Sequence, residues 1–396
     1  MSTPLEAKTV LSPANSLPGF LLLYAALYAA YGTESAYMPA FLGSHGLSAE
    51  QIGLVLAAGT IVRIAAGPAA GRLADRLGAH RLVVTTCASL SGVIGLAYTL
   101  AFGFGPLLAV SMAHAFTTAS LAPLSDAMSV TASANGRQFQ YGWVRGAGSA
   151  AFVAGTLLSS QLIDRFGLSS IIFSSSTLFL VMALCAMGVR TPAADENTTE
   201  KTASGAFGAL WKIAAFRRLI LVVVLVIGSH ALNDTFAVIH WREAGFGTLA
   251  ISILWSESVL AEVAVFLFFG PWLMGRLGPR GAAALAACAG IVRWTVMATT
   301  TSVPALAGVQ ALHGLTFALL HLAAMSIIAR TVPNGLSATA QTVYGTGALG
   351  IASAVMTVTS GYLYGWFEVQ AFWAMAVLCA IALPLIRGMD TPASGA

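Results

Sequence analysis

Long apolar segments recur along the whole chain, and each is about as long as a membrane crossing. A helix needs roughly 20 apolar residues to span a bilayer. The pattern predicts twelve such helices in two sets of six, near residues 19–43, 49–71, 82–102, 106–131, 139–163, 168–189, 217–241, 248–274, 281–300, 303–330, 337–363 and 368–387. Ser48 with Gln51 predicts a capping box at the second helix, and Pro333 predicts a stop after the tenth.

The composition excludes a water-soluble fold. The chain is 57% hydrophobic and 9% charged, whereas soluble domains carry about 25% charged residues. The net charge of +4 does not indicate nucleic-acid binding, because the basic residues lie in loops between apolar segments. We therefore expect an all-α membrane protein in contact with the lipid bilayer, with no nucleic-acid partner.

The basic residues predict the orientation, because cytoplasmic loops are rich in Lys and Arg. With the N-terminus inside, only Arg165 and Arg242 lie outside, and Arg63, Arg145 and Arg293 lie within helices. The residues predicted inside are Lys8, Arg72, Arg76, Arg81, Arg137, Arg190, Lys201, Lys212, Arg217, Arg218, Arg276, Arg280, Arg330 and Arg387. We expect a multi-pass protein of a bacterial inner membrane with both termini cytoplasmic and no cleaved signal peptide.

The two halves of the chain resemble each other. Gly275 to Arg280 is a weaker copy of Asp75 to His80, and His114 and His313 occupy near-equivalent places. A polar stretch separates the halves. We predict an N-terminal six-helix bundle over residues 1–189, a cytoplasmic linker over 190–216 and a C-terminal six-helix bundle over 217–396.

The charged stretch between the second and third predicted helices reads as a tight cytoplasmic turn. It carries Gly71, Asp75, Arg76, Gly78 and Arg81. Glycine permits the turn and a close approach of helices. Asp75 is expected to pair with the arginines of this stretch, including Arg72.

This stretch resembles the signature loop of the major facilitator superfamily, G-x-x-x-D-R-x-G-x-x-R. Other stretches are similar to the proton-coupled phenylpropionate permease branch, which is related to lactose permease and nucleoside–proton symporters: Arg63 with Gly67-Pro68, Tyr141 to Arg145, Ser229 to Ala231, Leu254-Trp255 with Ala261-Glu262, Arg293-Trp294, and His313 to Phe317 with His321. The resemblance implies two pseudo-symmetric six-helix bundles around a central cavity. It also implies that Gly71, Asp75, Arg76, Gly78 and Arg81 act as a conformational switch.

Ionisable residues within the predicted helices are the candidates for substrate binding and proton coupling. A charge at the bilayer centre costs at least about 2.5–3.5 kcal/mol, so such residues should face protein or water. The candidates are Tyr31, Glu34, Arg63, His114, Asp126, Arg145, His230, Asp234, Glu257, His313 and His321. Tyr31 belongs to an aromatic stripe, with Tyr24 and Tyr28, that is either packing or cavity lining.

Several pairings follow from depth and spacing. Asp126 and Arg145 are predicted at the inner ends of adjacent helices, where they would pair either structurally or for coupling. His230 and Asp234 are four residues apart on one helix face. A further pair, Glu262 with Arg293, is expected to be a structural ion pair at mid-depth.

Together these features predict a proton-coupled symporter that works by alternating access and takes up a small organic solute, with an aromatic carboxylate as the first choice. Proton-driven efflux is the alternative, as is uptake of a nucleoside, sugar, polyol, amine or siderophore-like chelate. An enzyme is not expected, because the chain has neither an HExxH nor a GxSxG motif. We expect a monomer without cofactor or bound metal, whose ligands are the substrate and protons.

Overall fold

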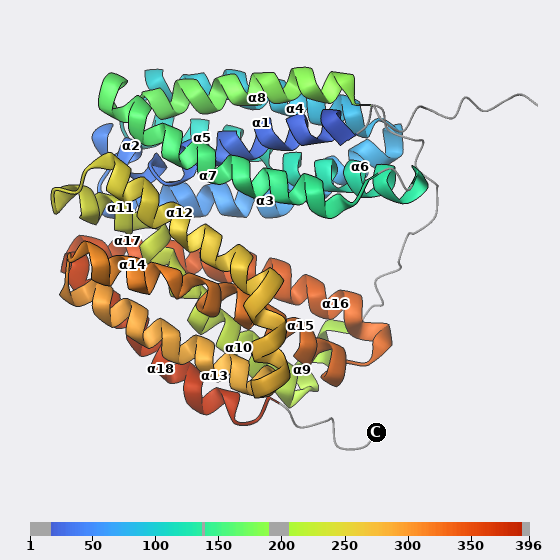
Figure 1. Ribbon diagram of the computed structural model, residues 1–396, viewed down its shortest axis with the longest axis vertical. Coiled ribbons are helices and arrows are strands. Elements are labelled where there is room, and N and C mark those ends of the chain that lie inside the picture. The colour runs from blue at the N-terminus through green and yellow to red at the C-terminus, as the bar shows by residue number, and fades with distance from the viewer. Residues whose placement is uncertain (1–16, 137–138, 190–205, 390–396) are drawn as a thin grey trace, which may run out of the picture.

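The computed structural model describes residues 17–136, 139–189 and 206–389, and within these ranges it contains helices and no strands. Figure 1 shows the helices in two groups that lie one above the other. The first group contains α1 (Leu17–Ser35), α2 (Met38–Ser44), α3 (Ala49–Leu77), α4 (His80–Leu96), η2 (Ala97–Leu100), α5 (Phe104–Thr118), α6 (Leu121–Gly136), α7 (Tyr141–Phe166) and α8 (Ser170–Gly188).

The second group follows the short helix α9 (Ala206–Lys212). It contains α10 (Ala214–Gly228), α11 (His230–Glu243), α12 (Thr248–Ala264), α13 (Gly270–Thr299), α14 (Val303–Ala311), α15 (Leu320–Thr331), α16 (Ser337–Thr342), α17 (Ala352–Phe367) and α18 (Phe372–Ile386). Three π-helical segments interrupt it, η3 (Val265–Phe269), η4 (Gly314–Leu319) and η6 (Val343–Ile351). The 3-10 turns η5 (Asn334–Leu336) and η7 (Glu368–Ala371) complete this group.

The described residues account for twelve membrane crossings. Nine helical stretches are long and apolar enough to cross a bilayer. Two of them are far longer than one crossing needs: Thr248–Thr299 turns back at Gly278 (φ 63°), and Thr339–Ile386 turns at Glu368 (φ 50°). Counting two crossings for each and one for α1 gives twelve. The prediction of an all-α protein with twelve transmembrane helices is therefore confirmed.

Small residues bring α1 and α7 into close contact. A Cβ placed on Gly32 would overlap the backbone of Phe152, and one on Gly155 would lie 2.5 Å from the carbonyl oxygen of Ala29. Thr156 and Ser159 also donate hydrogen bonds to the backbone of α1. This close packing does not involve Gly142 and Gly146 of α7, where an added Cβ would meet no described atom within 4 Å.

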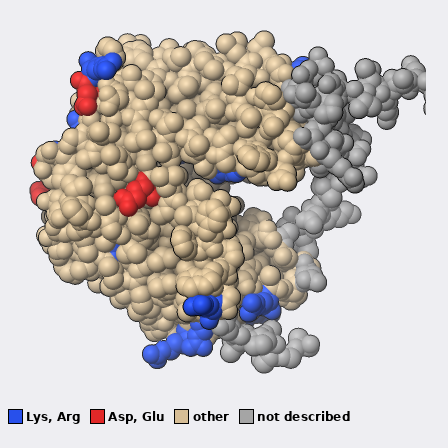
Figure 2. Space-filling view, viewed as in Figure 1, with Lys and Arg blue, Asp and Glu red and all other residues tan. Residues whose placement is uncertain are grey.

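The two helix groups meet at one end of the molecule. There the buried Tyr37 hydroxyl lies 2.8 Å from Ser252 Oγ and donates to the Thr248 carbonyl oxygen at 2.8 Å. Gly53 of α3 lies against the backbone of Gly361 of α17. Figure 2 shows a hollow between the groups towards the opposite end, which in Figure 1 carries α6, α9 and α16. One end is therefore closed and the other is open.

The signature stretch, Gly71 to Arg81, is mostly helix rather than turn. α3 continues through it to Leu77, six residues beyond the predicted end at residue 71. Only Gly78 (φ 57°) and Ala79 form the turn, because glycine takes the left-handed conformation that ends a helix. The capping box at Ser48 and Gln51 is confirmed. The predicted first helix is instead broken at residues 36–37, before α2, where Pro39 follows.

The predicted division into two bundles and a linker stays a prediction. Most of the linker, residues 190–205, lies outside the described residues, as do Lys8, Arg137, Arg190 and Lys201. α9 and the start of α10 at Ala214 occupy the remainder of the predicted linker.

Candidate functional site

A cavity of about 600 Å³ lies between the two helix groups. One wall comes from α1 and α7, with Tyr28, Tyr141 and Arg145, and the other from α12 and η3, with Glu262 and Phe266. Gly142 and Gly146 also line it. Opposite charges thus face one cavity from opposite groups, in keeping with the expectation that such charges meet water or protein rather than lipid.

Asp126 is held by tyrosines. Tyr24 Oη donates to Asp126 Oδ1 at 2.5 Å, and Tyr141 Oη donates to the same oxygen at 2.9 Å. Arg145 instead lies over the Tyr28 ring, with its Cζ 4.7 Å from the ring centroid. The expected ion pair between Asp126 and Arg145 is therefore not formed, because the carboxylate is hydrogen-bonded to two tyrosines and the guanidinium lies over the ring of a third. Arg145 remains exposed to the cavity.

A second charged cluster lies in the first group around Arg63, which is exposed at its position in α3. Glu34 and Tyr31 of α1 and His114 of α5 lie within electrostatic reach of this side chain. Tyr31 donates to the Thr118 carbonyl oxygen at 3.1 Å. His114 is buried between Tyr98 and Phe179, and its Nε2 lacks a hydrogen-bond partner within the described chain. These four predicted residues are thus brought together.

In the second group, a chain of polar side chains leads from the cavity wall into the protein. The fully buried Arg293 donates to Gln310 Oε1 at 2.6 Å and to His313 Nδ1 at 3.0 Å. His313 Nε2 lies 3.6 Å from Glu262 Oε2. An arginine can only donate, so Nδ1 accepts and the imidazole proton is on Nε2, which faces Glu262. The predicted direct pair between Glu262 and Arg293 is wrong, because His313 stands between them.

His230 packs against this row of polar side chains but does not pair with Asp234. Its ring lies 5.0 Å from that of His313 and 5.4 Å from Trp294, and its Nε2 has no hydrogen-bond partner in the part of the chain described. Asp234 is exposed and accepts from Asn233 at 3.2 Å. The expected His–carboxylate pair between His230 and Asp234 is therefore absent among the described residues.

The two remaining candidates are His321 and Glu257. His321 Nδ1 is 2.8 Å from the Tyr344 hydroxyl, and its ring meets Phe266 of η3. Glu257 is half-buried, and within the described ranges it forms no hydrogen bond or ion pair. The segments η3 and η4 flank Glu262 and His313, and π-helical turns often occur at functional sites.

The signature stretch lies away from the cavity. Asp75 pairs with His80 at 2.9 Å, and among the described residues it forms no ion pair with Arg72, Arg76 or Arg81. The expected pairing with arginine is therefore wrong for this conformation. No atom of the described residues lies within 4 Å of a Cβ placed on Gly71, so among them the close helix approach expected there is also absent.

Some residues of the site were not predicted. Gln310, the acceptor of Arg293, lies one helical turn before His313, and this spacing was the available signal. Tyr141 carries a hydroxyl at the start of α7, and its place in a stretch shared with related permeases gave no indication of its contact with Asp126. Tyr37 and Thr248 meet across the two groups, and nothing in a single sequence indicates that contact.

The fold and the site define a membrane transporter, since a polar cavity between two groups of membrane helices is where such proteins bind their substrates. The chain belongs to the MFS_1 like family, whose model matches residues 15–375. The resemblance to the major facilitator superfamily is thereby confirmed.

Known relatives and solved structures agree with this assignment. The chain is 32% identical over 370 residues to the probable 3-phenylpropionic acid transporter of Escherichia coli (strain K12), covering 91% of this chain and 94% of the relative. It is 25% identical to the uncharacterized transporter YwbF of Bacillus subtilis (strain 168), covering 85% and 83%. The crystal structure of the nucleoside transporter NupG (D323A mutant) superposes with a TM-score of 0.86 at 16% identity, covering 94% of this chain and 99% of that one. The chain is thus a transporter and not an enzyme.

Proposed function

We propose that the protein is a proton-coupled symporter that takes up a small aromatic carboxylate by alternating access. The observation that carries this proposal is the position of Glu262. Its carboxyl group lines the cavity and also approaches His313, which accepts a hydrogen bond from the buried Arg293. A proton gained by Glu262 from the cavity therefore changes the charge balance around a buried cation, which is the kind of event that biases one conformation over another.

The opposite wall supports a carboxylate as substrate. Arg145 is exposed to the cavity, and its planar guanidinium matches a carboxylate in two parallel hydrogen bonds. Tyr28 and Phe266 add aromatic surface on which a ring can pack. The name of the Escherichia coli relative, a probable 3-phenylpropionic acid transporter, points to the same class of solute.

The proposed orientation places the closed end outside. Arg72, Arg76 and Arg81 lie at the open end of α3 and α4, and cytoplasmic loops are those enriched in arginine. The protein would then rest in a bacterial inner membrane with its cavity open to the cytoplasm. Both walls of the cavity come from one chain, which supports a monomer as the working unit.

Transport into liposomes tests the proposal. Purified protein is reconstituted, and uptake of labelled 3-phenylpropionate is followed with and without an inward proton gradient. We expect the gradient to accelerate uptake by the unaltered protein. Glu262→Gln should keep exchange of labelled for unlabelled substrate but lose the acceleration, whereas Glu368→Gln, at the exposed η7 turn, serves as the matched control.

Two results would count against the proposal. Equal uptake rates with and without the gradient would remove proton coupling. Acceleration of substrate movement in the direction opposite to the protons would assign the protein to efflux by antiport.

A further inference from the structure

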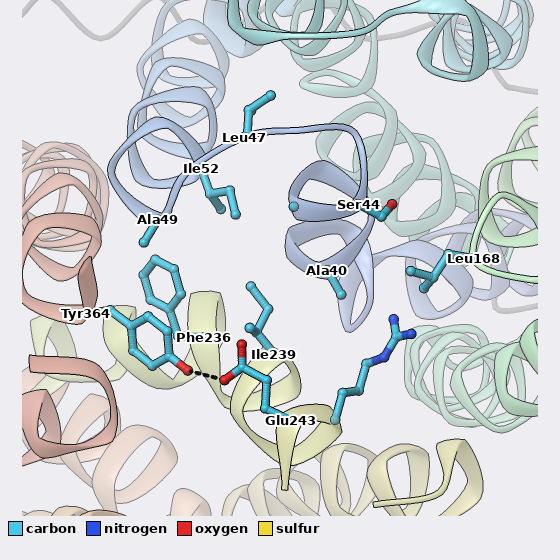
Figure 3. Close-up of a pocket in the computed structure, with 12 residues that line it drawn as sticks. Ala40, Ser44, Leu47, Ala49, Ile52, Leu168, Phe236, Ile239, Glu243 and Tyr364 are labelled. Atoms are coloured by element: carbon cyan, nitrogen blue, oxygen red, sulfur yellow. Dashed lines mark hydrogen bonds between the residues drawn. The ribbon is translucent and has the colours of Figure 1, made fainter. Parts of the chain in front are cut away.

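A second cavity lies at the closed end of the molecule. It has a volume of about 400 Å³ and shares no lining residue with the central cavity. Its walls come from both helix groups, with α2 and the start of α3 on one side and α11 and α17 on the other (Figure 3). Pockets that hold small organic ligands measure about 300–1,000 Å³, so this cavity has room for a compact molecule.

One side of this cavity is aromatic and aliphatic. The rings of Phe236 and Tyr364 are stacked, with centroids 4.4 Å apart and planes 7° apart. Ile52 and Ile239 flank them in Figure 3. Such a surface suits a flat or alkyl body rather than a hydrated ion.

Two charged groups line the same cavity, and they differ in their contacts. The carboxylate of Glu243 accepts a hydrogen bond from the Tyr364 hydroxyl at 3.3 Å, as the dashed line in Figure 3 shows. Arg242 forms no hydrogen bond or ion pair with any described residue. The cation is therefore the group that is available to a ligand.

The position of Arg242 in the sequence adds to this argument. With the proposed orientation, Arg242 and Arg165 are the two Lys or Arg residues on the outer side of the membrane, against the general bias of the chain. Arg165 ends α7 and does not line the cavity. Arg242 alone combines an outer position with a built pocket.

We propose that this outer cavity binds a small carboxylate with an apolar body, reached from outside while the outer end is closed. The carboxylate lies on Arg242 and the body lies against Phe236 and Tyr364. The sidedness rests on the proposed orientation, but the binding chemistry does not. Because the ligand would touch both helix groups, it binds the closed outer end better than the open one and stabilises it.

Equilibrium binding to the full chain in lipid nanodiscs tests this site. The probe is labelled phenylacetate, and phenylacetamide is the uncharged competitor of nearly the same shape. Arg242→Gln is compared with the matched control Arg165→Gln, both in an Arg145→Gln background that removes the cation of the central cavity. We expect Arg242→Gln to weaken the remaining binding about tenfold or more, Arg165→Gln to leave it unchanged, and Arg242→Lys to restore part of it.

The comparison of the Arg242→Gln and Arg165→Gln proteins measures binding at the outer cavity whether or not Arg145 binds substrate. The test therefore remains valid even if the proposed transport function is wrong. Equal binding by the Arg242→Gln and Arg165→Gln proteins would overturn the proposal. Equal competition by phenylacetamide would overturn it as well, because a site built on a cation must discriminate against the amide. Absence of any saturable binding in the Arg145→Gln background would have the same consequence. Unfolding temperatures of all variants are measured to exclude misfolding as the cause.

Discussion

The closed end of the transporter depends on the Tyr37 hydroxyl, and Tyr37→Phe should open it. This hydroxyl donates to the Thr248 carbonyl oxygen and lies within hydrogen-bond distance of Ser252 Oγ, both at 2.8 Å. Tyr37 belongs to the first helix group, whereas Thr248 and Ser252 belong to the second. The substitution removes both contacts across the interface and leaves the ring in place.

The size of the effect follows from the number of bonds. A hydrogen bond within a protein contributes about 0.5–1.5 kcal/mol net, so the two together contribute about 1–3 kcal/mol to the closed end. Each 1.4 kcal/mol is a factor of ten in an equilibrium constant. The ratio of open to closed outer ends should therefore rise by a factor of about 5 to 150.

Distances between spin labels measure this ratio directly. The labels are attached at Leu100→Cys and Thr301→Cys, in a background without the four native cysteines. These two positions are exposed at the same end of the molecule and belong to different helix groups. Opening of this end is seen as a longer distance between the labels. Tyr364→Phe is the matched control, because its 3.3 Å bond to Glu243 joins α17 to α11 within one group. We expect Tyr37→Phe to raise the long-distance population and Tyr364→Phe to leave it unchanged. An equal distribution for all three proteins would refute the view that Tyr37 holds the two groups together.

Three further outcomes are expected. Gln310→Leu removes the hydrogen-bond acceptor of the buried Arg293 and should lower the free energy of unfolding by about 1.5–3 kcal/mol. Denaturation in detergent measures this free energy, and an unchanged value would contradict the role of this bond. Gly32→Ala should lower the unfolding temperature, because the added Cβ overlaps the α7 backbone, whereas Gly146→Ala should leave it unchanged. Equal unfolding temperatures for the two variants would disprove the packing argument. Asp75→Asn should change the free energy of unfolding by less than about 1 kcal/mol, since the pair with His80 is exposed. The same substitution should nevertheless slow turnover in the liposome assay. Unchanged turnover would contradict the proposed switch role of the signature stretch.

The broad architecture was predictable because it depends on composition. A bilayer permits few backbone conformations, so long apolar segments must become helices. Local signals were equally direct where the chemistry is local, as at Ser48 with Gln51 and at Gly78. The end of α3 was misplaced because the charged residues over 72–76 suggested a turn, although they continue the helix beyond the apolar segment.

Pairings between side chains were less predictable. Depth along a helix brought Glu262 and Arg293 to the correct level, but depth does not say what stands between two groups. In the same way, Asp126 and Arg145 lie close in depth, and Tyr24 and Tyr28 intervene. Which neighbour reaches a charge first depends on helix rotation and tilt, and these are set by packing that a single sequence does not contain.

The three π-helical segments all lie in the second helix group, after α12, between α14 and α15, and between α16 and α17. A π turn holds one residue more than an α turn, so its return to α geometry would rotate everything beyond it by about 100°. In η4 that rotation would carry His321 around the helix axis relative to His313. The second group thus contains points within its helices where such a rotation can take place, whereas the first group has α1 closely packed on the glycines of α7.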